Sequence, residues 1–161
     1  MSFWKVIRGL NFRQISSLFS WFLKHPLYMT STMFATFKTY RISQKKFPNI
    51  HGGHNKANAF RHALWNILIA QKCARFSKDI NDVLEWTKQI TDWHEEFSPN
   101  EEMPKVMDLH NNQKGREYFV ELMKKKEKDI INYMMAQLEH SVKVKEISDI
   151  RQTDYLVYLE D

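Results

Sequence analysis

Three short polar stretches carry the side chains in this sequence that are suited to chemistry. In the first, Asn58, His62 and Asn66 recur at four-residue spacing within a strongly apolar run. This spacing places the three side chains on one side of a helix, where buried polar groups need partners. Arg61 can flank the same edge of that helix. The stripe therefore predicts either a functional site or a structural hydrogen-bond network.

The second stretch places carboxylates near the expected end of another helix. Asp92 shares a face with Glu95 or Glu96, and acids at this spacing repel unless they share a proton, a metal ion or a cationic partner. Carboxylates at a helix C-terminus also oppose the helix dipole. We therefore expect these carboxylates to have a positively charged partner. His94 points elsewhere on an ideal helix, but a frayed helix end would let it turn inward.

The third stretch runs up to Arg116 and places Asp108, Asn111 and Asn112 along one stripe. Asparagine pairs have low helix propensity. Gly115 permits the close approach of another backbone or of a ligand. The stretch predicts a helix that uses its amides, either in a site or in a hydrogen-bond network that ties helices together.

A histidine, several carboxylates, several amides and two arginines that converge would suit a hydrolase. Carboxylates and imidazole hold a divalent cation or activate water, and a guanidinium neutralises a developing anion. No thiolate restricts the metal, so Zn²⁺, Mn²⁺ and Mg²⁺ all stay open. One set is predicted both as the catalytic residues and as the metal ligands: His62, Asp92, Glu95 and Asp108. The predicted substrate-binding residues are Arg61, Asn58, Asn66, His94, Asn111, Asn112 and Arg116.

These residues predict a hydrolase, metal-assisted or of plain acid–base type, that acts on an anionic substrate of the phosphoester or phospholipid kind. The alternative is a non-enzymatic helical binding protein or immunity-like protein whose polar stripes form a buried network. The two hypotheses differ in one observable. A hydrolase site must open to solvent, whereas a structural network should be closed and mutually satisfied.

The same residues carry a resemblance to a known group of sequences. Residues 58–65 (NAFRHALW), 91–95 (TDWHE) and 107–116 (MDLHNNQKGR) resemble the motifs of an uncharacterised family of small bacterial helical domains, also found as C-terminal modules of toxin-like proteins. The resemblance implies a shared site without naming a reaction. A weaker similarity is to the helical HD-type phosphohydrolases, with His94 and Glu95 in place of their His-Asp pair. The Glu departs from that pattern, so the similarity is an analogy only.

The elements that must position these residues are predicted to be helices. Apolar residues at helical spacing, with only four Gly and four Pro, favour a mainly α protein, a compact bundle of five to six helices. After His140 the residues alternate, which predicts a small C-terminal β-hairpin within residues 142–160. A single domain is expected over residues 1–161, with the site helices at 55–116. The expected helices run from Phe3 to Leu23, from Pro26 to about Lys46, from Asn55 or Asn58 to about Phe76, from about Ser77 to about Phe97, and from Asn100 to about Leu138.

The charge and hydropathy of the sequence limit where the protein can be located and which partners it can bind. The net charge of +5 suits an anionic partner, but the basic residues look dispersed and partly offset, so nucleic acid is neither indicated nor excluded. Residues 1–24 are predicted to form an amphipathic basic helix that would suit peripheral contact with an anionic membrane, although such a stripe more often packs on its own core. No cleaved signal peptide is expected. A cytoplasmic protein is predicted, with peripheral membrane attachment or export without a cleaved signal as alternatives. Cys73 is expected to be a core thiol.

Overall fold

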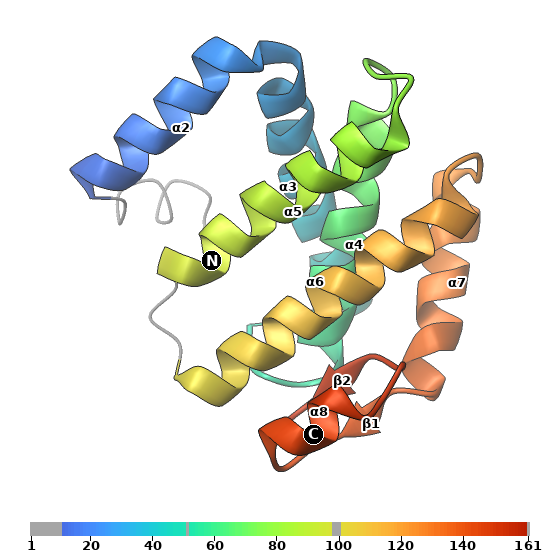
Figure 1. Ribbon diagram of the computed structural model, residues 1–161. Coiled ribbons are helices and arrows are strands. Elements are labelled where there is room, and N and C mark those ends of the chain that lie inside the picture. Colours follow the sequence, from blue (N-terminus) through green and yellow to red (C-terminus); the bar gives the residue numbers. More distant parts are fainter. Residues whose placement is uncertain (1–10, 51, 98–100, 161) are drawn as a thin grey trace.

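The computed structural model describes residues 11–50, 52–97 and 101–160, and within them the chain is a helical bundle with a small sheet at its C-terminal end (Figure 1). The predicted fold class is confirmed. The elements are α2 (Phe12–Lys24), α3 (Pro26–Lys46), α4 (Lys56–Cys73), α5 (Ile80–Phe97), α6 (Glu102–Leu122), α7 (Glu127–Glu139), β1 (Val142–Lys143), α8 (Ile147–Arg151) and β2 (Val157–Tyr158).

Side-chain caps set where α2 and α4 begin. The Asn11 side chain accepts a hydrogen bond from the backbone N–H of Gln14, and the Gln14 side chain accepts one from the backbone N–H of Asn11. This reciprocal capping box starts α2 at Phe12. The predicted helix from Phe3 lies partly outside the described residues. Asn55 caps α4, as expected, by accepting a hydrogen bond of 3.2 Å from the backbone N–H of Asn58.

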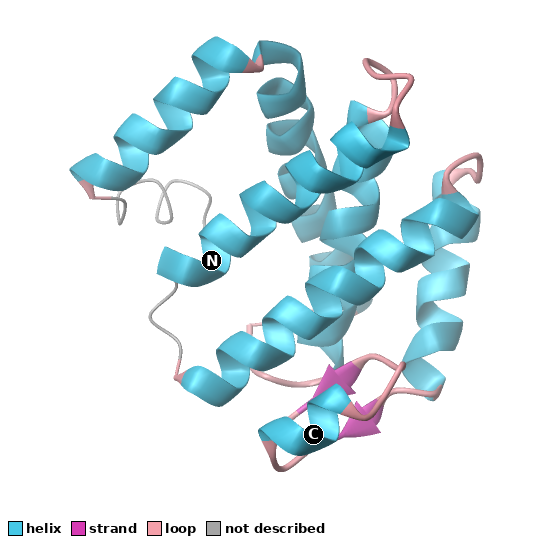
Figure 2. Cartoon of the chain, viewed as in Figure 1, coloured by secondary structure: helices cyan, strands magenta, loops and turns pink. Residues whose placement is uncertain are grey.

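Helix α4 is the centre of the bundle, and α3, α5, α6 and α7 all pack against it (Figures 1 and 2). Its apolar side chains, such as Phe60, Leu64 and Ile67, are fully buried. Helix α6 approaches α4 so closely that a Cβ added to Gly115 would lie only 2.4 Å from the backbone oxygen of Ala63. The two helices that carry His62 and Asp108 are therefore in direct backbone contact.

The long helix predicted to run to about Leu138 is interrupted. Helix α6 ends at Leu122, a turn follows, and α7 begins at Glu127. The turn contains the consecutive lysines 124–126, whose like charges repel and which bury no apolar face to hold a helix together. The charged run that we expected to be a solvated helix face is thus in part a connection between two helices.

The C-terminal strands pair in parallel, with Val142 opposite Val157, so the expected hairpin is wrong in its connection. A hairpin joins antiparallel strands, whereas here α8 lies between the two strands. Glu146 and Asp149 form a capping box at the start of α8 and so favour a helical turn in that connection. Among the described helices, none has both the length and the apolar composition needed to cross a membrane.

Candidate functional site

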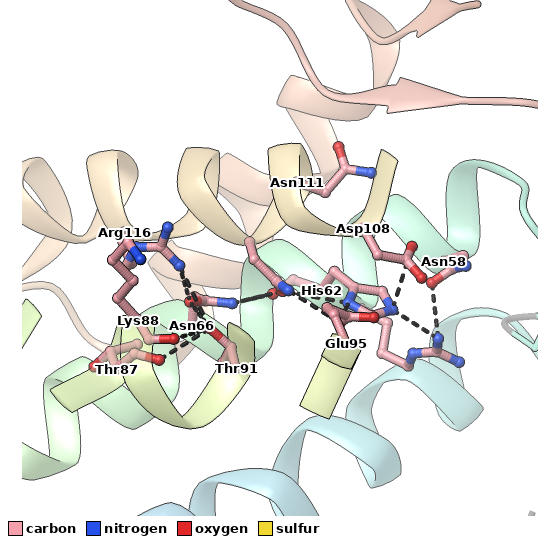
Figure 3. Close-up of polar contacts among 12 residues, drawn as sticks. Asn58, His62, Asn66, Thr87, Lys88, Thr91, Glu95, Asp108, Asn111 and Arg116 are labelled. Atoms are coloured by element: carbon pink, nitrogen blue, oxygen red, sulfur yellow. Dashed lines mark hydrogen bonds and ion pairs between the residues drawn. The ribbon is translucent and has the colours of Figure 1, made fainter. Parts of the chain in front are cut away.

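Helices α4, α5 and α6 each direct one titratable side chain to the same point in the core (Figure 3). His62 from α4, Glu95 from α5 and Asp108 from α6 each offer one ligand atom, and these atoms all lie within 4.8 Å of one another. The three residues are only 3%, 1% and 2% exposed. We call them the His62 cluster. The sequence predicted all three as members of one site.

The imidazole of His62 lies between the two carboxylates. Its Nδ1 is 3.3 Å from Glu95 Oε1 and 3.2 Å from Asn112 Oδ1, while its Nε2 is 3.6 Å from Asp108 Oδ1 and 2.9 Å from Arg61 Nη2. Because a guanidinium only donates, Nε2 accepts from Arg61 in the neutral ring, and the hydrogen sits on Nδ1. This assignment leaves Nδ1–H to donate to Glu95 or to Asn112.

A row of amides extends the cluster toward Arg116 (Figure 3). Arg116 Nη1 donates to Asn66 Oδ1 at 3.0 Å, Asn66 Nδ2 donates to Asn112 Oδ1 at 2.8 Å, and Asn112 Nδ2 donates to Glu95 Oε1 at 3.1 Å. The donors therefore all point along the row toward the Glu95 carboxylate. This direction suits an ionised Glu95, since hydrogen bonds to a carboxylate stabilise its charge.

The two carboxylates of the cluster titrate in opposite directions. Burial opposes ionisation of Glu95, but the hydrogen bond and charge of His62 together with Asn112 hold its pKa below its ordinary value. Burial raises the pKa of Asp108, and the nearby Glu95 raises it further against the opposing effects of His62 and Arg61. The pair thus combines a preferred anion with a carboxyl group that resists ionisation, which is the usual arrangement of an acid–base site.

One acceptor of the cluster lacks a hydrogen bond. Glu95 Oε2 is buried and has no hydrogen-bond partner among the described residues. A buried carboxylate oxygen without a donor costs free energy, and a cation beside it would remove that cost. Two carboxylates and one imidazole are hard and borderline ligands that accept Zn²⁺, Mn²⁺ or Mg²⁺. The His62 cluster therefore fits a divalent cation.

Three of the predicted residues are not brought to the cluster. The carboxylate of Asp92, predicted as a fourth ligand, lies 2.6 Å from Lys88 Nζ. The ring of His94 packs edge-on against Trp65 with ring centroids 5.2 Å apart, and burial lowers its pKa. Asn111 points away from His62 (Figure 3), because its side chain bonds both the N–H and the C=O of Val157 in β2.

Five predicted substrate-binding residues remain, and together with the His62 cluster they form one chain of contacts, which we call the polar row. Asn66 and Asn112 lie inside it, while Asn58 and Arg61 lie at one end and Arg116 lies at the other. Arg61 Nη2 donates to Asn58 Oδ1 at 2.8 Å at one end, and Arg116 occupies the other. Burial lowers the pKa of both guanidiniums against the acidic side chains around them. Thr91 was not predicted, although its hydroxyl lies 3.3 Å from Asn66 Oδ1 and 3.4 Å from Arg116 Nη1. Its position four residues before Glu95, on the same face of α5, is the signal that would have found it.

Comparison with known proteins gives a family without a described activity. No curated protein matches the chain, and no solved structure matches it. A family model described as "Domain of unknown function (DUF6973)" matches residues 19–142, a span that includes α3 to α7 and every residue of the polar row. The chain belongs to this family of uncharacterised domains.

Proposed function

We propose that this protein is a metal-assisted hydrolase of an anionic phosphoester. The observation that supports this proposal most directly is the His62 cluster itself, in which three ligand-type side chains from three helices meet within 4.8 Å and Glu95 Oε2 lacks a hydrogen bond among the described residues. A divalent cation held by His62, Glu95 and Asp108 would supply positive charge to neutralise phosphoryl oxygens.

The residues around the cluster suit the other steps of such a reaction. Glu95 and Asn112 orient the imidazole of His62 through Nδ1, as the carboxylate partner of a catalytic histidine does. Arg61 holds Nε2 in this conformation. If the Arg61 guanidinium moved to a substrate phosphate, Nε2 would become free to hold the cation, which would supply the charge that activates the attacking water. Arg61 is half-buried, so solvent reaches part of its side chain, whereas His62, Glu95 and Asn112 are buried.

A groove close to Asp108 offers a substrate route. It has a volume of about 630 Å³ and includes His54, Pro104 and Leu159 in its lining. Pro104 lies one helical turn before Asp108 on α6, and His54 is close enough for its charge to lower the pKa of Asp108. Opening of this groove toward the cluster would connect the site to solvent. The analogy with HD-type phosphohydrolases adds little, because His94, the counterpart of their second histidine, faces Trp65.

Hydrolysis of a chromogenic phosphodiester tests the proposal. With purified protein and added Mn²⁺ or Zn²⁺, we expect turnover that falls by at least about 10²-fold in His62→Ala, because the cation loses one of its three side-chain ligands. Glu96→Gln is the matched control, since Glu96 is exposed and adjacent to Glu95 but outside the cluster. Absence of turnover on both phosphodiesters and phosphomonoesters, with the protein folded and loaded with metal, would contradict a phosphoester hydrolase.

One observation favours a second candidate, a non-enzymatic binding protein whose polar row fixes the packing of its helices. The three cluster residues are at most 3% exposed, and nearly all polar atoms of the row are paired. A structural network of this kind should lose much of its stability when His62 is removed, because Arg61, Asn112 and two carboxylates lose a partner. Marked unfolding of His62→Gln, together with no metal binding by the parent protein, would favour this candidate over the hydrolase.

A further inference from the structure

Helix α2 turns a continuous apolar face away from the bundle. Leu18 and Trp21 pack toward the core, and Gln14 is buried on the same side. On the other side, large apolar side chains recur at three- and four-residue spacing and stay exposed, with Phe12 at 87% and Phe19 at 62%. The exposed apolar residues of α2 are Phe12, Ile15, Phe19, Phe22 and Leu23. Most of the hydrophobic surface of this helix therefore does not contribute to the core.

Helix α3 carries a second exposed apolar stripe that begins in its first turn. Leu27, Met33, Phe34 and Phe37 are exposed at helical spacing, with Phe34 at 64%. The same outward stripe then becomes basic, through Arg41 and the lysines that end the helix. We call the exposed apolar residues of α2 and α3, together with the basic end of the α3 stripe, the outer face.

Cations border the apolar part of the outer face. Arg41 lies over the ring of Phe37 at 5.8 Å from its centroid, and Lys72 of α4 lies over the ring of Phe34 at 6.0 Å. Lys72 also lines a surface groove of about 570 Å³ whose other basic residues are Lys38, Arg75, Lys124, Lys125 and Lys126. One acid lines the groove, Glu127, and it forms an ion pair with Lys38. The groove therefore keeps a strong excess of positive charge.

The charge of the chain is sharply divided. Residues 1–78 contain 13 Lys and Arg and no Asp or Glu, and all 19 acidic residues follow from Asp79 onward. Helices α2, α3 and α4 consequently carry no carboxylate at all. A surface that is both strongly basic and free of acids has an anionic partner as its complement. The +5 net charge of the whole chain conceals this division.

We propose that the outer face docks onto an anionic phospholipid bilayer. Exposed aromatic and aliphatic side chains on a helix that lies flat enter the region between headgroups and acyl chains, while bordering Lys and Arg bind the anionic headgroups. A second copy of this chain is a poor occupant, because two acid-free basic faces repel each other. Nucleic acid would use the cations but would leave Ile15, Leu23 and Leu27 exposed to water. This proposal does not depend on the His62 cluster or on its metal.

Co-sedimentation of the full chain with vesicles tests the docking surface. We expect binding to vesicles of phosphatidylcholine with phosphatidylglycerol and little binding to phosphatidylcholine alone, with affinity that falls as salt is raised. The double variant Phe19→Ser/Phe34→Ser should bind at least about tenfold more weakly, since two exposed aromatic rings no longer enter the bilayer. Arg41→Ser/Lys45→Ser should bind about thirtyfold more weakly.

The matched control is Lys145→Ser/Tyr155→Ser, which removes one exposed cation and one exposed ring near the C-terminal sheet and should bind like the parent protein. Folding of each variant is checked by its far-ultraviolet circular dichroism and thermal midpoint. Failure of the parent protein to bind anionic vesicles would overturn the proposal. If the control variant lost vesicle binding as strongly as the other two variants, the proposal would also be overturned. The same holds if Phe19 and Phe34 were needed for dimerisation of the protein but not for vesicle binding. Binding to nucleic acid but not to vesicles would also overturn it.

Discussion

Replacement of Gly115 by alanine should separate α4 and α6, two of the three helices that carry the His62 cluster. The added Cβ would lie 2.4 Å from the oxygen, 2.7 Å from the Cα and 2.9 Å from the carbonyl carbon of Ala63. Ordinary contact for a Cβ begins at 3.4 Å, so α6 must move away from α4 by about 1 Å. All three atoms belong to backbone, and no side chain can rotate aside to relieve the contact.

Two opposing effects decide the size of this change. Overpacking of a tight core costs about 1–3 kcal/mol, and a contact with backbone atoms belongs at the upper end of that range. Alanine gains about 1 kcal/mol over glycine in a helix interior. We therefore expect Gly115→Ala to lower the free energy of unfolding by about 2 kcal/mol. In a chain of this size the thermal midpoint should fall by about 4–8 °C.

Urea unfolding followed by circular dichroism measures this free energy. Gly52→Ala is the matched control, because a Cβ there meets nothing within 4 Å, and it should change the free energy of unfolding by less than about 0.5 kcal/mol. If Gly115→Ala were instead as stable as the parent protein or more stable, helix propensity would outweigh packing. The close approach of α4 and α6 would then be refuted.

Three further predictions concern single buried groups. Asn111→Ala should cost about 2–4 kcal/mol of unfolding free energy in urea, because the N–H and C=O of Val157 lose their partner; a cost below about 1 kcal/mol would contradict this anchor. The ionised form of Glu95 is favoured by folding, so metal-free protein should lose stability as the pH falls from about 4.5, the ordinary pKa of Glu, through the lower pKa of the folded state. In urea unfolding at a series of pH values, Glu95→Gln should reduce this loss of unfolding free energy at acid pH. An unchanged loss in the variant would show that other groups cause it. Burial raises the pKa of Cys73 to about 12, so a thiol reagent at pH 8 should label it only after unfolding, and rapid labelling of native protein would contradict a core thiol.

The polar residues of α4 could be predicted from the sequence, because the four-residue spacing of a helix was sufficient to place them on one face. Asn58, His62 and Asn66 follow the four-residue spacing of a helix, and their apolar neighbours required that face to be buried. The structure places all three in the polar row. Their distant partners required knowledge of how α5 and α6 pack against α4.

For the carboxylates of α5 and the asparagine pair of α6, the local sequence pattern was insufficient to predict which partner each side chain contacts. Asp92 and Glu95 are three residues apart on one face, and only the packing of α5 decides that Glu95 faces His62 while Asp92 reaches Lys88. Adjacent helical residues point about 100° apart. Asn111 and Asn112 therefore had to serve different partners.

The overall charge was also misjudged from the sequence. The basic residues looked dispersed when they were counted over the whole chain, but the first 78 residues hold more than half of them and no acid. A count by segment would have shown this division. The parallel pairing of β1 and β2 was beyond local pattern, since it depends on α8 and on the anchor from Asn111.

Metal binding by single-site variants tests the central proposal most directly. Equilibrium dialysis of the parent protein against Mn²⁺ or Zn²⁺, followed by elemental analysis, should give one equivalent of metal per chain. Glu95→Gln and Asp108→Asn should each lose it, while Asp92→Asn should retain it, because the Asp92 carboxylate lies against Lys88 and outside the cluster. No bound metal in the folded parent protein, or equal loss in Asp92→Asn, would contradict a metal site made by His62, Glu95 and Asp108.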